Sequence, residues 1–199
     1  MMRQVCVLYE DERVPQRSFG LHELAKACVR DRLEAQPRYE IDQALRDCRP
    51  LGGDSNVLKK FREDVDSIAA DGRPVVAVFD NDRIRRLLKL PAKATDAQVL
   101  QEIRKGTSSD RLHVILLDRN MESVIKAAHE CDPSIRQESV DLAIKKKDRL
   151  ERDAILARLT GPQFRAVRDC IREKLPSFQE LVELLCELIQ RPARSRKKS

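Results

Sequence analysis

One stretch decides the fold class of this 199-residue chain: Pro74-Val75-Val76-Ala77-Val78-Phe79-Asp80-Asn81-Asp82-Arg83. Its apolar, β-branched run is unbroken and stops at two aspartates spaced one residue apart. Such a run is typical of a strand that is buried on both faces of a parallel sheet. Strands of this kind deliver polar residues to the edge of the sheet where α/β proteins bind their ligands. An ordinary Asp-Asn turn after a core strand is the alternative interpretation.

Two more apolar runs end in the same way. Residues 3–9 form a strand candidate that is followed by Glu10, and residues 111–117 form another that is followed by Asp118. Apolar residues at helical spacing lie between these runs, and a helix between two strands favours the right-handed crossover of a parallel sheet. The sequence therefore predicts an α/β fold with a mostly parallel sheet flanked by helices.

The rest of the chain contains no further clear strand. Residues 38–47 fit either a short strand or an irregular helix, and the Pro and Gly residues of 49–53 predict a loop. Residues 137–190 predict about three helices, broken at Gly161-Pro162 and Leu175-Pro176. We therefore predict an α/β domain over 1–132, a helical segment over 133–190 and a disordered basic tail over 191–199.

Composition narrows the function classes. Aromatic residues make up 4% of the chain and tryptophan is absent, which argues against nucleic-acid binding by base stacking. The net charge is +6, but five of these charges lie in the last nine residues, so the remaining chain is close to neutral. The six cysteines form no CxxC pair, and we expect most of them to be reduced and buried. No apolar run is long enough to span a membrane, and we expect a cytoplasmic protein.

Glu10, Asp80 and Asp82 place three carboxylates at the ends of predicted strands, and carboxylate oxygens suit a hard cation such as Mg²⁺. The set resembles the Toprim domain of topoisomerases, primases and OLD-family nucleases. In that domain a glutamate closes the first strand, an Asp-x-Asp closes a later one, and together they hold Mg²⁺. The resemblance covers about residues 3–130. Residues 112–122 are also similar to the OLD-type segment in which a strand precedes an Arg/Asn-rich turn and a glutamate.

The resemblance implies cleavage of DNA or RNA phosphodiester bonds with Mg²⁺ or Mn²⁺ as cofactor. It implies that Glu10, Asp80 and Asp82 are catalytic metal ligands and that Arg83 neutralises charge on the phosphate. Further candidates for a second ion are Glu12, Asp118 and Glu122. Candidates for nucleic-acid contacts are Arg119, Arg194, Arg196, Lys197 and Lys198.

The chain departs from the family pattern in three ways. Asp11 stands where a glycine is common, and the long separation of Glu10 from Asp80 requires an insertion, for which 38–53 is the candidate. OLD nucleases normally carry an ATPase domain, whereas residues 1–199 contain no GxxxxGK[ST] loop. The resemblance therefore implies an effector subunit that works with a separate ATPase or sensor, and association with bacterial defence against phage.

Three other interpretations are open, and two of them use the same acids. A non-catalytic module would bind a partner, or a second copy of the chain, through the apolar face of residues 178–189, and nucleic acid through the basic tail. A haloacid-dehalogenase-like phosphatase would use Asp80 as nucleophile and Asp82 as acid, although Arg83-Ile84 replaces the usual Gly-Thr. A response-regulator receiver would use Asp80 as phosphoacceptor, which leaves Asp82 unexplained.

His113 lies inside a predicted strand, where a histidine of the core or of the sheet edge is a simpler interpretation than a general base.

Overall fold

The computed structural model describes residues 2–10, 20–51, 57–91, 93–107, 109–118 and 120–190. The strands are β1 (Cys6–Tyr9), β2 (Asp47–Pro50), β3 (Val75–Asp80) and β4 (Leu112–Leu117). The helices of the first two thirds of the chain are α1 (Gly20–Arg32), α2 (Arg38–Ala44), α3 (Val57–Ala70), α4 (Asn81–Leu87), α5 (Asp96–Arg104) and α6 (Asn120–Cys131). The remaining helices are α7 (Gln137–Ile144), α8 (Arg149–Arg158), the 3-10 helix η1 (Pro162–Phe164), α9 (Arg165–Lys174) and α10 (Pro176–Gln190).

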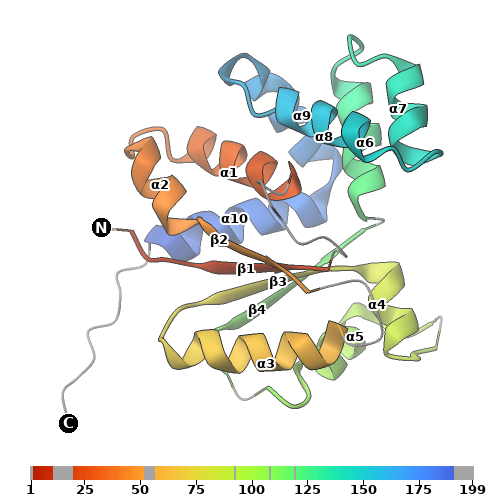
Figure 1. Ribbon diagram of the computed structural model, residues 1–199. Helices are drawn as coiled ribbons and strands as arrows, with labels where there is room; N and C mark the ends of the chain where they lie inside the picture. The colour runs from red at the N-terminus through yellow and green to blue at the C-terminus, as the bar shows by residue number, and fades with distance from the viewer. Residues whose placement is uncertain are drawn as a thin grey trace.

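The strands form one sheet in the order β2-β1-β3-β4, and each neighbouring pair is parallel. Helices cover both faces of this sheet: α3 and α5 lie on one face, and α1, α2 and α10 lie on the other (Figure 1). The predicted α/β class, with a parallel sheet and an all-helical C-terminal part, is confirmed. In the part of the chain that the structure describes, no helix has both the length and the apolar character needed to cross a membrane.

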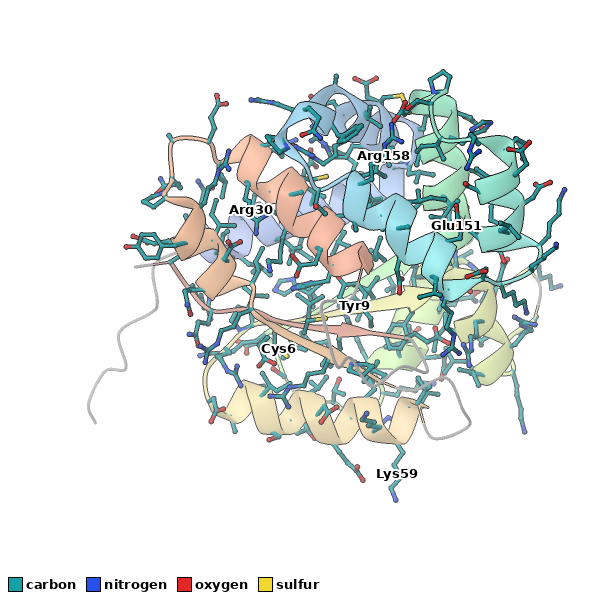
Figure 2. The ribbon with its side chains drawn as sticks, turned by 45° about the horizontal axis from the view of Figure 1, so that its top comes forward. Cys6, Tyr9, Arg30, Lys59, Glu151 and Arg158 are labelled. Carbon is teal, nitrogen blue, oxygen red and sulfur yellow. A yellow bond between two sulfur atoms is a disulfide. The ribbon has the colours of Figure 1, made fainter. Side chains whose placement is uncertain are left out.

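Alternation along the strands divides the core into two apolar clusters, one on each face of the sheet. On β1, Val7 and Tyr9 belong to the cluster with α1 and α10, whereas Cys6 and Leu8 belong to the cluster with α3. This pattern follows from the two-residue period of side chains on a strand. The opposite surface of α3 faces solvent, where Lys59 extends away from the sheet (Figure 2). Both faces of the sheet are therefore buried, as the unbroken apolar runs predict.

Strand β2 corrects the prediction at residues 49–53, of which 49 and 50 belong to a strand instead of a loop. Its sequence, Asp47-Cys48-Arg49-Pro50, contains no apolar run because β2 is a half-buried edge strand that pairs with β1 alone. Edge positions also tolerate proline. The ambiguous segment before it is resolved as helix α2, with Ile41 and Ala44 buried.

The C-terminal helices complete the core. The apolar face of α10 is buried in the same cluster as β1 and α1, through Phe178, Leu181, Val182, Leu185, Leu188 and Ile189. The backbone also ties the end of α10 to the start of β1, because Arg3 N donates to Ile189 O (3.0 Å). The apolar face is thus occupied within the chain, and its burial gives no support to the alternative in which it binds a partner or a second copy. The segment 137–190 contains four α-helices and η1, where about three helices were predicted.

Two contacts hold the C-terminal helices in place. Cys131 at the end of α6 forms a disulfide with Cys170 on α9, with a Cα–Cα distance of 5.9 Å. The expectation of reduced cysteines is wrong for this pair. The two residues meet because α6 packs on α9, and their spacing in the sequence gives no indication of a disulfide. Cys6, Cys28 and Cys186 are buried free thiols, as expected.

Arg168 of α9 is 2% exposed, and its guanidinium makes two hydrogen bonds to the Asp31 carboxylate of α1 (2.6 and 2.8 Å).

Candidate functional site

Glu10 lies at the carboxyl end of β1, directly beside the end of β3. Its backbone N–H donates to Val78 O (3.0 Å), which extends the pairing of β1 with β3 by one residue. Its side chain turns toward β3, where Oε2 accepts a hydrogen bond from Asp80 N (3.1 Å). The structure therefore brings Glu10 and Asp80 together although 70 positions separate them in the sequence.

The Glu10 carboxylate is buried next to an arginine. Its side chain is 1% exposed, and Oε1 lies 3.1 Å from Arg83 Nε in an ion pair. This pair lacks hydrogen-bond geometry, so Oε1 is a buried carboxylate oxygen that accepts no hydrogen bond from the described residues. An oxygen of this kind has coordination capacity left for a further ligand.

Burial raises the pKa of Glu10 to about 7. The Arg83 charge and the hydrogen bond from Asp80 N oppose this shift, and the neighbouring Asp80 charge adds to it. The contribution of the Asp80 charge indicates that the carboxylates of Glu10 and Asp80 lie close enough to repel each other. A pKa that is shifted by burial together with a specific charged neighbour is more frequent at functional sites than elsewhere in proteins.

Asp80 and Asp82 do not continue as an extended strand. The chain turns into α4 directly after Asp80, which serves as the N-cap of that helix, and Asp80 Oδ1 accepts from Asp82 N (3.3 Å). Asp80 is half-buried and Asp82 is exposed in the first turn of α4. The structure therefore joins Asp80 to Glu10 through adjacent strand ends, and to Asp82 through the helix cap.

A pocket of about 280 Å³ opens beside this cap. The start of α4 contributes Asn81 and Asp82, the residue after β4 contributes Asp118, and α6 contributes Ser123. The segment that joins α9 to α10 contributes Lys174 to Ser177. That segment is tied to β4 because Asp118 N donates to Ser177 Oγ (3.2 Å). Asp118 and Asp82 thus line the same pocket, and the contribution of the C-terminal helices to this pocket was not predicted.

The other predicted site residues fall into two groups. Glu122 is exposed in the first turn of α6 and does not line the pocket. Glu12, Arg119, Arg194, Arg196, Lys197 and Lys198 lie outside the described residues. Within the described ranges, no three His, Cys, Asp or Glu side chains form a group that could hold a metal ion. Glu10 and Asp80 are therefore the acids whose contact the structure establishes.

Two histidines lie on or beside the strands of the sheet, and each has a structural position. His113 is half-buried on the edge strand β4, which agrees with the edge interpretation. His22 is 2% exposed, and its Nε2 contacts Leu45 O (2.7 Å) while its Nδ1 contacts the Tyr9 hydroxyl (3.2 Å). Burial lowers the pKa of His22 to about 4. The neutral ring then donates from Nε2 and accepts at Nδ1, and it fixes the residue that precedes Glu10.

Comparison with known proteins gave no match, either to a protein-family model, to a curated protein or to a solved structure. The arguments for function therefore depend on the residues of this chain.

Proposed function

We propose that this protein is a Mg²⁺-dependent, Toprim-like nuclease that cleaves DNA or RNA, with Glu10 and Asp80 at its centre. The observation that carries the proposal is the hydrogen bond from Asp80 N to Glu10 Oε2, which brings these two residues together at the carboxyl ends of adjacent parallel strands. This edge of a parallel sheet is where α/β proteins bind ligands. Among the described residues, Glu10 Oε1 has an ion pair with Arg83 but accepts no hydrogen bond, and we take this as capacity for a cation.

The residues at this edge fit a single Mg²⁺ ion. Protein-bound Mg²⁺ usually keeps several waters and takes one or two carboxylates together with phosphate oxygens of the substrate. Glu10 and Asp80 would supply those carboxylates, and Asp82 would supply an outer contact from the first turn of α4. A bound ion would polarise a phosphate oxygen and lower the pKa of an attacking water.

Arg83 has a defined role in this proposal. Its side chain is 29% exposed, so it reaches solvent while its Nε pairs with Glu10. A substrate phosphate at the sheet edge would meet this guanidinium, which can neutralise negative charge that develops during cleavage. Arg83 also keeps the buried Glu10 anion compensated when no cation is bound.

A non-catalytic role is the second candidate, and one observation favours it. Glu10 is already paired with Arg83, and the described residues contain no three-acid metal group. In that case the Glu10–Arg83 pair would serve to hold α4 against β1. Calorimetry with Mg²⁺ and Mn²⁺ separates the two candidates, because a non-catalytic module binds neither ion at this edge.

The test is nicking of supercoiled plasmid and cleavage of single-stranded RNA by the purified protein, in Mg²⁺, in Mn²⁺ and in EDTA. Glu10→Gln and Asp80→Asn keep the side-chain size and remove the charge. Asp66→Asn is the matched control, since Asp66 is an exposed acid on α3. We expect a loss of at least about 10- to 100-fold in the two site variants, because that loss already accompanies changes around metal ligands. Equal activity in all four proteins, or activity that survives EDTA, would refute the assignment.

A further inference from the structure

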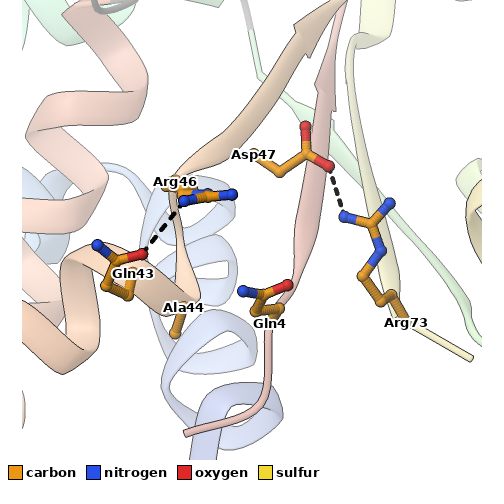
Figure 3. Close-up of a pocket in the computed structure, with 6 residues that line it drawn as sticks. All are labelled: Gln4, Gln43, Ala44, Arg46, Asp47 and Arg73. Carbon is orange, nitrogen blue, oxygen red and sulfur yellow. Dashed lines mark hydrogen bonds and ion pairs between the residues drawn. The ribbon is translucent and has the colours of Figure 1, made fainter. Parts of the chain in front are cut away.

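A second pocket lies at the opposite edge of the sheet from Glu10. It has a volume of about 280 Å³ and is lined by Gln4, Gln43, Ala44, Arg46, Asp47 and Arg73. These residues come from four places: the segment before β1, the end of α2, the start of β2 and the segment before β3. Their polar groups face one another across the opening (Figure 3). The amino ends of three adjacent strands thus form a polar pocket that is separate from the proposed nuclease site.

Asp47 is the one acid in the lining of this pocket, and its oxygens are already engaged. Oδ1 accepts from Arg49 Nε (3.1 Å), and Oδ2 accepts from Arg73 Nη1 (2.6 Å) and Arg49 Nη2 (3.3 Å). Burial acts to raise the pKa of Asp47, but these hydrogen bonds and charges outweigh it and hold the pKa below its usual value. Asp47 therefore stays an anion that is satisfied within the chain, and its role is to fix Arg73 in the wall.

The other wall presents donors that are not fully used. Arg46 is exposed, and its contact with the described residues is one long hydrogen bond from Nη1 to Gln43 Oε1 (3.5 Å). Its guanidinium carries five N–H donors in a planar fork. The Gln4 and Gln43 side chains add amide groups to the lining (Figure 3). With two arginines and one compensated aspartate, the lining has an excess of positive charge and of hydrogen-bond donors.

We propose that this pocket binds a small oxyanion, a carboxylate or a phosphate group, which the Arg46 fork and the Gln4 and Gln43 amides hold opposite Arg73. A guanidinium matches the paired oxygens of either group in two parallel hydrogen bonds. The volume admits the anionic group with a few further atoms, so the ligand is a small molecule or a single group of a larger one. The proposal does not depend on nuclease activity, because it uses none of the residues at the Glu10 edge.

The test is an NMR titration of the ¹⁵N-labelled full chain with inorganic phosphate and, separately, with acetate, at constant ionic strength set by NaCl. The signals to follow are the Nε–H of the arginines and the side-chain amides of the glutamines. Arg46→Gln removes the fork, and Arg38→Gln is the matched control because Arg38 is an exposed arginine at the other end of α2. Circular dichroism establishes that both variants keep the helical content of the natural chain.

We expect saturable shifts with at least one anion in the natural chain and in Arg38→Gln. In Arg46→Gln we expect binding weaker by at least about 10-fold, since a hydrogen bond to a charged group typically contributes a factor of this size or more. Saturation with phosphate alone or with acetate alone identifies which oxyanion the pocket takes. Shifts that do not saturate with either anion, or equal binding by Arg46→Gln and the natural chain, would overturn the proposal.

Discussion

His22 makes the stability of this protein depend on pH in a direction that the structure fixes. The ring is 2% exposed, and it is held in the neutral form between Leu45 O and the Tyr9 hydroxyl. Burial lowers its pKa from 6.5 to about 4, so the unfolded chain takes up a proton between these values while the folded chain does not. The contribution of neutral His22 to the free energy of unfolding is therefore complete above pH 6.5 and is lost as the pH falls toward 4. A shift of this size corresponds to about 3 kcal/mol in total, of which about 2 kcal/mol is lost between pH 7 and pH 4.5.

The assay is urea unfolding at pH 7 and at pH 4.5, followed by circular dichroism, for the natural chain and for His22→Gln. Glutamine retains hydrogen-bonding groups but does not titrate, so the stability difference between the two proteins should shift in favour of the variant by about 2 kcal/mol at the lower pH. His129→Gln controls for the loss of a histidine, since His129 is half-buried and contacts Ile135 O near the surface. Parallel pH profiles for the natural chain and His22→Gln, or an NMR titration in which the folded His22 ring protonates near pH 6.5, would refute the reasoning.

Three further outcomes follow from the structure. In EDTA, Glu10→Gln should have a higher melting temperature than the natural chain at pH 8 and a smaller advantage at pH 5. The reason is that burial raises the pKa of Glu10 from 4.5 to about 7, so the folded chain favours the protonated carboxyl. The stability gained from this protonated form is complete below pH 4.5 and is lost as the pH rises through 7. Arg168→Met should cost about 3 kcal/mol in chemical unfolding, since it leaves the half-buried Asp31 carboxylate without its buried partner. Partial restoration of stability by a second change, Asp31→Leu, would support this cause. Cys131→Ser should lower stability by about 4 kcal/mol without reductant, from the loop that the bridge to Cys170 closes, and should match the natural chain in dithiothreitol. Peptide mapping without reduction checks the bridge itself, and a free Cys170 in the natural oxidised chain would contradict it.

The sequence was sufficient for the parts of the fold that depend on local pattern. β1, β3 and β4 were predicted because strands buried on both faces require continuous apolar residues. β2 was missed because a half-buried edge strand does not require them, so Asp47-Cys48-Arg49-Pro50 carries a turn-like composition. The start of α5 also follows from local pattern, because Thr95 and Gln98 form the reciprocal hydrogen bonds of a capping box there.

The site was predicted only as far as strand ends could place it. Glu10 and Asp80 were expected to meet because parallel strands deliver their last residues to one edge, and Asp80 N donates to Glu10 Oε2 as that argument requires. The position of Asp82 was not predictable from strand alternation, because the chain turns into α4 at the Asp80 cap. The pairing of Arg83 with Glu10 and the arrival of Ser177 beside Asp118 join distant segments, and no local pattern encodes them.

The burial of Glu10 is the strongest argument that this edge of the sheet does more than hold the fold together. A buried ion pair is a weak source of stability, because desolvation of the two charges can exceed their attraction, and an apolar residue of similar volume often serves stability as well. Glu10 is placed where burial and the Asp80 charge both oppose its ionised form, and one of its oxygens accepts no hydrogen bond from the described residues. A bound cation would remove all three penalties at once, since it would neutralise Glu10 and Asp80 and coordinate the remaining oxygen. Under the proposed function, a divalent cation would relieve the part of this cost that the Arg83 charge leaves uncompensated, and Glu10→Gln would then gain stability in EDTA while it loses the proposed activity.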